Sequence, residues 1–220
     1  MGKMIVIEGL DGSGKGTQAA LLLSRLKESG KDAFAIDLPN YSDDSSALVK
    51  MYLKGEMGTH PGDVNAFAAS TFYAVDRYAS FKKFWNKEYD GGKIIVANRY
   101  TTSNACHQMT KLPEKDWDFF LDWLFDFEYR KLEIPEPDCV IFLDMPVEVS
   151  QKLLEKRYQN DESKKDIHEL DVDYLLHCRK AAGYACDKLG WNRIVCAENG
   201  KPKSVEEISD LVFDCVQKYI

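Results

Sequence analysis

The sequence predicts an α/β fold in which one five-stranded parallel sheet is flanked by helices. Short apolar runs rich in β-branched residues alternate with helix-length segments, which is typical of a parallel sheet covered by helices. A glycine-rich loop follows the first run, and a polar segment follows the third. The predicted strands are residues 4–8, 33–38, 93–97, 139–144 and 193–197.

Three intervening segments have helical patterns. Residues 17–29 form the first predicted helix, and Gly30 ends it as a typical C-cap. Residues 64–85 and 114–131 form two longer helices rich in aromatic side chains. Because there is no repeat or Pro/Gly-rich linker, we expect a single domain over residues 1–220.

Composition excludes several classes of function. The chain is 45% hydrophobic and 30% charged, as globular proteins are, and no apolar run approaches the ~20 residues of a membrane helix. The net charge of -7 without a basic stripe argues against a nucleic-acid polymer as partner. The first residues resemble no secretion leader, and the six cysteines contain no C-x-x-C pair, so we expect a cytoplasmic protein with buried, reduced thiols.

The segment GLDGSGKGT at residues 9–17 has the spacing of a P-loop. Its glycines let backbone N–H groups converge on phosphate oxygens, and the following helix presents its positive N-terminal end. Lys15 adds a full charge for the β- and γ-phosphates. This motif predicts a bound nucleotide but not its acceptor. The predicted ATP-binding residues of the loop are Gly9, Gly12, Ser13, Gly14, Lys15, Gly16 and Thr17.

The segment NRYTTSNACHQ at residues 98–108 follows the third strand, at the edge where open α/β sheets bind ligands. Together with the P-loop, DLPNY at 37–41, YAVDR at 73–77 and KDIHE at 165–169, it makes the sequence resemble the thymidylate kinase family from end to end. The resemblance implies a P-loop kinase fold, Mg²⁺ as cofactor and a homodimer. It implies ATP-dependent phosphorylation of dTMP to dTDP.

The resemblance also implies roles for single residues. Asp11 contacts the sugar 3′-hydroxyl, Tyr73 stacks on thymine and Arg77 reaches the base carbonyl O4. Arg99 grips the acceptor phosphate and, with Lys15, is the predicted catalytic pair. Because that phosphate is already an anionic nucleophile, positioning and charge neutralisation matter more than a general base.

Structural alternatives remain open for these residues. Asp11 could cap a turn, and Arg99 could form a structural ion pair. Tyr73 could join the aromatic core beside Phe72, with Arg77 in a surface ion pair.

Further substrate-binding candidates lie on the helix after Arg99. Ser103 and Asn104 match positions near the acceptor phosphate and the thymine edge, although both residue types commonly cap helices. His107 matches a position beside the sugar 2′-carbon, and His168 belongs to the same region by resemblance. Either histidine could exclude ribonucleotides by filling the space at the 2′ position. Alternatively, each could be exposed to solvent, or buried in the core with its hydrogen bonds satisfied.

Residues 155–170 are dense in both charge signs and poor in apolar residues, so we predict a mobile lid, with an ordinary exposed loop as the alternative. Arg157 is a predicted ATP-binding residue. The lid motif comprises Lys164, Lys165, Asp166 and Glu169. Ile167 stands where relatives have an arginine, so Arg157, Lys164 or Lys165 would supply that cation.

Other departures from the family pattern leave the metal ligands unknown. Gly16 replaces the Ser or Thr that usually binds Mg²⁺, so water or Thr17 would take that role. Asn98 replaces a strand-end aspartate, and Asp37 stands where many relatives have an arginine. Two other functions stay open: a nucleoside monophosphate kinase of other base specificity, and a nucleotide-binding switch without transfer activity.

Overall fold

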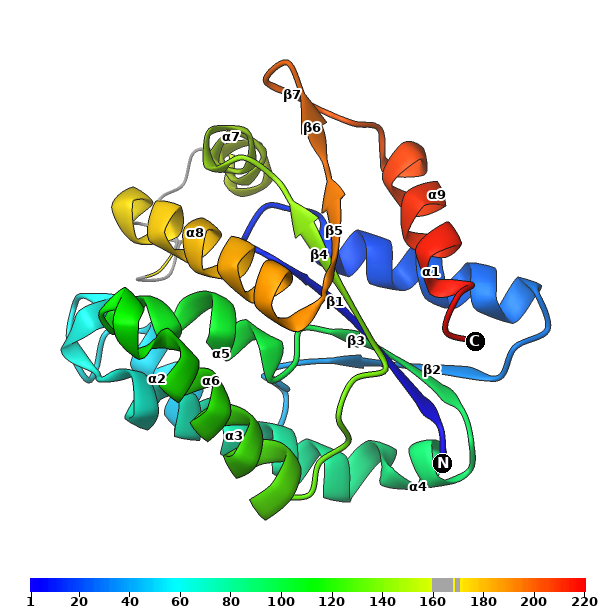
Figure 1. Ribbon diagram of the computed structural model, residues 1–220, viewed down its shortest axis with the longest axis horizontal. Coiled ribbons are helices and arrows are strands. Elements are labelled where there is room, and N and C mark those ends of the chain that lie inside the picture. The colour runs from blue at the N-terminus through cyan, green and yellow to red at the C-terminus, as the bar shows by residue number, and fades with distance from the viewer. Residues whose placement is uncertain (160–167, 169–170) are drawn as a thin grey trace.

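The computed structural model describes residues 1–159, 168 and 171–220. At its centre is a parallel sheet with strand order β2-β3-β1-β4-β5 (Figure 1). The strands are β1 (Lys3–Gly9), β2 (Ala33–Asp37), β3 (Ile94–Asn98), β4 (Cys139–Asp144) and β5 (Asn192–Val195). The predicted five-stranded parallel sheet is confirmed. Its last strand ends earlier than expected, because Ala197 belongs to a small hairpin of β6 (Ala197–Glu198) and β7 (Lys201–Pro202).

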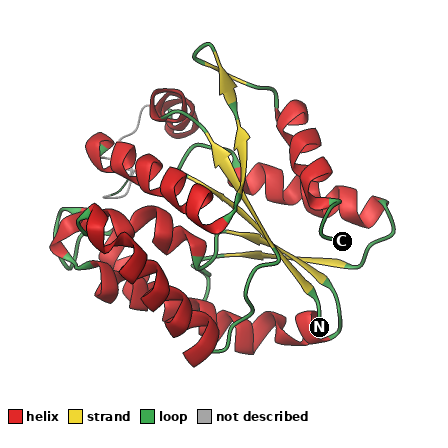
Figure 2. Ribbon diagram, viewed as in Figure 1, coloured by secondary structure: helices red, strands yellow, loops and turns green. Residues whose placement is uncertain are grey.

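Helices cover both faces of this sheet (Figure 2). They are α1 (Lys15–Glu28), α2 (Ala47–Leu53), α3 (Ala66–Ser80), α4 (Asn86–Asp90), α5 (Thr102–His107), α6 (Trp117–Phe125), α7 (Val147–Tyr158), α8 (Val172–Leu189) and α9 (Val205–Val216). Among the described helices, none combines the length and apolar character that crossing a membrane requires.

The two faces of the sheet bury alternate residues of the same strand. Ile5 and Ile7 of β1 pack in the cluster formed with α1 and α9, whereas Met4 and Val6 pack in the cluster that contains Trp85. This alternation follows from the period of two residues in a strand. Because both faces are covered, the strand sequences are almost continuously apolar, which is why they were recognisable.

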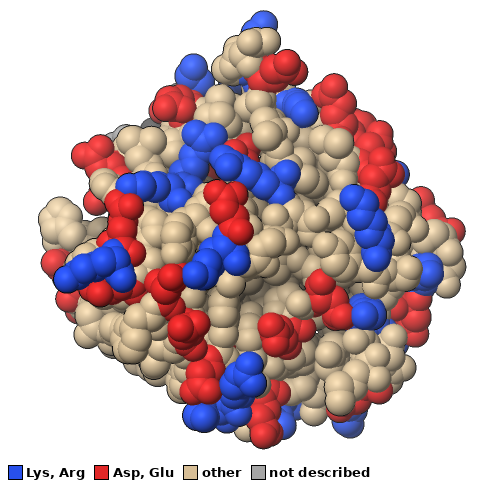
Figure 3. Space-filling model, viewed as in Figure 1, with Lys and Arg blue, Asp and Glu red and all other residues tan. Residues whose placement is uncertain are grey.

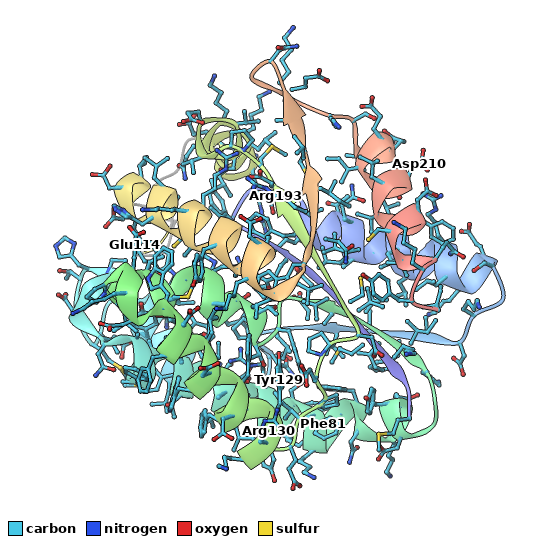
Figure 4. The ribbon with its side chains drawn as sticks, viewed as in Figure 1. Phe81, Glu114, Tyr129, Arg130, Arg193 and Asp210 are labelled. Atoms are coloured by element: carbon cyan, nitrogen blue, oxygen red, sulfur yellow. The ribbon has the colours of Figure 1, made fainter. Side chains whose placement is uncertain are left out.

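The two aromatic helices end in π-helical segments that the sequence analysis did not anticipate. Phe81–Trp85 continues α3, and Asp126–Lys131 continues α6. In the second segment, the Leu132 N–H donates to the Phe127 carbonyl at 2.9 Å, an i to i+5 bond. Such turns are rare and occur frequently at functional sites. Phe81 and Tyr129, one from each segment, lie on the same side of the sheet (Figure 4).

The predicted lid is only partly described. Residues 155–158 form the last turn of α7, so the prediction of a loop is wrong there. The lid-motif residues Lys164, Lys165, Asp166 and Glu169, and Ile167 with them, lie outside the described residues. The cysteines are free, and Cys215 is the one of the six that is not fully buried, in agreement with the prediction of buried thiols.

Candidate active site

The phosphate loop connects β1 to α1 in a conformation that depends on glycine. Gly12 has φ 78° and Gly14 has φ 87°, both in the left-handed region. A Cβ atom on Gly12 would lie 2.6 Å from the carbonyl oxygen of Ser150, so the loop passes too close to α7 for any side chain. Among the described residues, no side chain caps the N-terminus of α1, and its first turn carries no acidic residue. Its backbone N–H groups are therefore available to an anion.

Lys15, at the start of α1, is buried at the base of this loop. Its Nζ donates to the Leu10 carbonyl at 2.8 Å and lies 3.5 Å from Asp11 Oδ1. Burial, together with the nearby charge of Arg99, lowers the pKa of Lys15 to about 8. Lys15 thus still carries its charge at neutral pH in the predicted position.

Arg99 follows β3 and faces the phosphate loop across the sheet edge. Its backbone φ is 67°, which is costly for a residue with a side chain and is typical of functional sites. The guanidinium forms an ion pair with Asp11, and its Nη1 lies 3.3 Å from His107 Nε2. Although burial opposes it, the charges of Arg99 and Lys15 hold the pKa of Asp11 well below its usual range. Both predicted residues are therefore ionised and paired to one another.

Glu8 is a site residue that the sequence analysis missed. It is fully buried in β1, and its two carboxylate oxygens accept from Ser103 Oγ at 2.6 and 3.0 Å. The backbone N–H of Tyr100 also donates to it. Burial raises the pKa of Glu8, while the charge of Arg99 opposes that rise. A charged residue inside the apolar run MIVIEG was the available indication. Ser103, which was predicted to lie near a phosphate, binds this carboxylate.

Arg77 lies buried in α3 and forms an ion pair with Glu128 of the second π-helical segment. Its Nε and Nη2 donate to the two oxygens of Glu128 at 2.6 and 2.5 Å. The pair is 3% and 0% exposed, so the alternative of a surface ion pair is wrong. Glu128 was also missed, although it is an acid inside the aromatic stretch FDFEYRK. Asn104 Nδ2 reaches the same carboxylate at 3.4 Å.

Two histidines stack face to face beside Arg99. The ring centroids of His107 and His168 are 5.7 Å apart, and the rings are tilted by only 12°. His168 Nε2 lies 2.8 Å from the hydroxyl of Tyr52. Burial lowers the pKa of His168 to about 3 and that of His107 well below its ordinary value. Both histidines are neutral at physiological pH, and the alternative that they are solvated is wrong.

One cavity of 820 Å³ brings most of the predicted residues together, a volume typical of small-molecule sites. Tyr73 and Arg77 line it, as does Arg157 from α7. Its predicted lining residues also include Asp11, Gly12, Gly14, Lys15, Gly16, Thr17, Arg99, Ser103, Asn104 and His107. Gly9 and Ser13 do not line it. Ser13 is buried, and a Cβ atom on Gly9 would lie 2.5 Å from its Oγ. Basic and acidic side chains are interspersed over the face shown in Figure 3.

The residues at the ends of β2 and β3 suit a hard cation. Asn98 Nδ2 donates to Asp37 Oδ1 at 2.7 Å, and both residues line the cavity together with Thr17. Within the described part of the chain, no group of three His, Cys, Asp or Glu could hold a metal alone. This donor set fits Mg²⁺, which usually takes one or two carboxylates and completes its shell with water and phosphate oxygens. In the sequence alone, Asp37 is recognisable only as a departure from the family pattern.

Comparisons with known proteins agree with this geometry. Residues 7–206 match the family profile described as thymidylate kinase. The thymidylate kinase of Mycobacterium tuberculosis (strain ATCC 25618 / H37Rv) is 28% identical over 186 residues, which cover 83% of this chain and 84% of that protein. The probable thymidylate kinase of Thermococcus onnurineus (strain NA1) is 32% identical over 155 residues, covering 70% and 71%.

A solved structure, thymidylate kinase from Candida albicans, shares the fold. Its TM-score is 0.70 at 18% identity, and the alignment covers 99% of this chain and 92% of that one. The P-loop kinase fold that the sequence predicted is therefore confirmed. With the family profile spanning nearly the whole chain, the protein belongs to the thymidylate kinase family.

Proposed function

We propose that this protein transfers the γ-phosphoryl group of ATP to dTMP, giving ADP and dTDP. The observation that carries the proposal is that one cavity joins the phosphate loop to the walls formed by Tyr73, Arg77 and Arg99. Membership of the thymidylate kinase family supports the same substrate pair and supports neither of the other two functions. Donor and acceptor would meet inside the cavity, where positioning lowers the barrier to transfer.

At the donor side, the N-terminus of α1 and Lys15 would bind the β- and γ-phosphates of ATP. The uncapped N–H groups and the buried ammonium both stabilise negative charge. Arg157 lines the cavity from α7 and would add a cation on the ATP side.

At the acceptor side, Arg99 would exchange Asp11 for the phosphate of dTMP. Its planar guanidinium suits a bidentate contact with that phosphate. Its positive charge would also stabilise the phosphoryl group in transfer. Asp11, once released, would accept a hydrogen bond from the sugar 3′-hydroxyl. The phosphate oxygen attacks in line without a general base, because it is already anionic.

The walls farther from the loop would bind the nucleoside. Tyr73 would stack on thymine, while Arg77 and Asn104 would bind the edge of the base. His107 would lie beside the sugar, where its neutral ring, stacked on His168, limits the space at the 2′ position.

Mg²⁺ would be held by Asp37 and Thr17, with Asn98 orienting the Asp37 carboxylate through its amide. When bound, the ion supplies positive charge to the phosphate oxygens.

The single-domain organisation and the cytoplasmic location stay predictions. A homodimer is supported by exposed apolar side chains on the two aromatic helices, Val75 on α3 (46%) and Phe119 on α6 (65%).

A panel of nucleoside monophosphates in an assay that couples ADP release to a signal tests the function. We expect dTMP to be the preferred acceptor, with Lys15→Met as the inactive control. Preferred use of AMP or UMP would favour a kinase of other base specificity. Intact ATP binding without transfer to any acceptor would favour a nucleotide switch.

A further inference from the structure

Glu128 connects the two side chains that face the base in the proposed function. Its oxygens accept from Arg77 at 2.6 and 2.5 Å, from Asn104 Nδ2 at 3.4 Å and from Thr101 Oγ1 at 2.9 Å. Arg77 and Asn104 line the cavity, whereas Glu128 lies fully buried behind them. A carboxylate in this position controls which polar atoms its two partners present to a ligand.

The donors of Arg77 can be counted. A guanidinium carries five N–H groups and no acceptor. Nε and Nη2 each donate to Glu128, and Nη1 donates to the Tyr100 carbonyl at 3.4 Å. One N–H on each terminal nitrogen therefore remains, and Arg77 can offer the cavity only donors.

The orientation of Asn104 follows from its acceptors. Its Nδ2 donates to the Ser70 carbonyl and to Glu128 Oε1, both at 3.4 Å. A carbonyl and an ionised carboxylate only accept, so the amide nitrogen must face them. Among the described residues, none donates a hydrogen bond to Asn104 Oδ1. Asn104 thus offers the cavity an acceptor.

We propose that Glu128 determines base specificity by fixing a donor on Arg77 beside an acceptor on Asn104. This pattern complements the C4 carbonyl and N3–H of a 4-oxopyrimidine. Cytosine presents the inverse pattern, an amino group and an unprotonated N3, so its nucleotide would leave buried polar atoms unpaired. The inference rests on the proposed function and deepens it, because it assigns selection of the base to a residue outside the cavity.

The π-helical segment explains how Glu128 reaches this position. The i to i+5 bond at Phe127 and Leu132 widens the turn, and the Ile134 N–H bonds to the Glu128 carbonyl at 3.2 Å. Glu128 is a positioning residue, since it acts on the base only through Arg77 and Asn104. Burying its charge is costly, and orienting two partners at once is a reason to retain it.

The test compares kcat/KM for dTMP, dUMP and dCMP in the wild type and Glu128→Gln. Gln keeps the size of Glu128, but its amide can donate, so Asn104 is free to turn and Arg77 loses its counter-charge. We expect the ratio of dTMP to dCMP to fall by about tenfold or more, the equivalent of one lost buried hydrogen bond. The ratio of dTMP to dUMP should not change, because both bases are 4-oxopyrimidines.

Asp144→Asn is the matched control. Asp144 is also buried and ion-paired, with Arg179 and Arg193, but does not line the cavity. This variant loses a buried counter-charge as Glu128→Gln does, while its ratio of dTMP to dCMP should stay at the wild-type value. A change confined to the amount of folded enzyme leaves that ratio unaltered and so cannot imitate the expected result.

Thr101→Val is a milder variant, because it removes only the hydroxyl that donates to Glu128 Oε2. It should lower the ratio of dTMP to dCMP, but by less than Glu128→Gln does. It replaces Glu128→Gln as the test if that variant does not fold. An unchanged ratio in every folded variant overturns the inference. A wild-type enzyme that does not prefer dTMP overturns the proposed function instead, so the two failures are distinct.

Discussion

The donor and acceptor sides of the cavity are built in opposite ways. At the donor side, Lys15 contacts Leu10 and Asp11, which are its near neighbours in the sequence. At the acceptor side, the contacts of Arg77 with Glu128 and of Glu8 with Ser103 span 51 and 95 residues. A short motif thus specifies one side locally, whereas only the completed fold assembles the other.

The two sides also differ in how they handle charge. The phosphate loop relies on backbone N–H groups and a helix dipole, which need no counter-ion. The acceptor wall instead buries Glu8 and Glu128 at considerable desolvation cost and pairs them with hydroxyl, amide or guanidinium donors. Mutations at the donor side should therefore affect charge alone, whereas those at the acceptor side should affect both charge and geometry.

The largest expected effect is that of Lys15→Met. Removing the ammonium from the donor side should lower kcat by about 10³-fold, because the transferring group loses the cation that the phosphate loop supplies. Binding of dTMP, measured by calorimetry, should persist, since the acceptor charges come from other elements. Equal loss of dTMP binding would show that the two sides are not separable.

Arg99→Lys tests whether geometry matters at the acceptor side. Lysine keeps the charge but not the planar fork, so we expect kcat/KM for dTMP to fall by about 10²-fold while the affinity for ATP changes little. Arg99→Ala is the companion variant and should be at least as impaired. Near wild-type activity of Arg99→Lys would mean that charge alone suffices.

Glu8→Gln should separate activity from stability. Burial raises the pKa of Glu8, so the folded state disfavours its charge, and the neutral isostere relieves that cost at pH 8. We expect kcat to fall by about tenfold, because Ser103 and the backbone N–H of Tyr100, which follow Arg99, lose the carboxylate to which they donate. The free energy of unfolding in urea at pH 8 should not fall. A marked loss of stability with unchanged kcat would make Glu8 purely structural.

The smallest effect concerns pH. His168 has a folded pKa of about 3, below its ordinary 6.5, so the unfolded chain binds a proton first as the pH falls. The contribution of neutral His168 to the free energy of unfolding is thus present above pH 6.5 and lost on acidification. Between pH 6.5 and 5 the loss is about 2 kcal/mol. In urea unfolding, His168→Gln should show a shallower pH dependence than the wild type.

The same contrast explains what the sequence could predict. The apolar strands and the loop GLDGSGKGT carry local patterns, and both were located correctly. Most of the predicted site residues line the cavity, whereas Gly9 and Ser13 do not. Glu8 and Glu128 were missed because their partners lie far away in the chain, and no local pattern indicates that a single acid in an apolar run is paired. The pairing of Asp37 with Asn98 required the strand order, which places β2 beside β3.

The π-helical segment Asp126–Lys131 has a consequence for how this family can diversify. A π turn is an α-helix with one residue too many, so deleting one residue there would leave a regular helix that still packs its aromatic face. The deletion would rotate Glu128 by about 100° relative to that face. Base preference would then change through the length of a helix rather than through the identity of any residue in the cavity, a route that comparisons of aligned positions alone do not reveal.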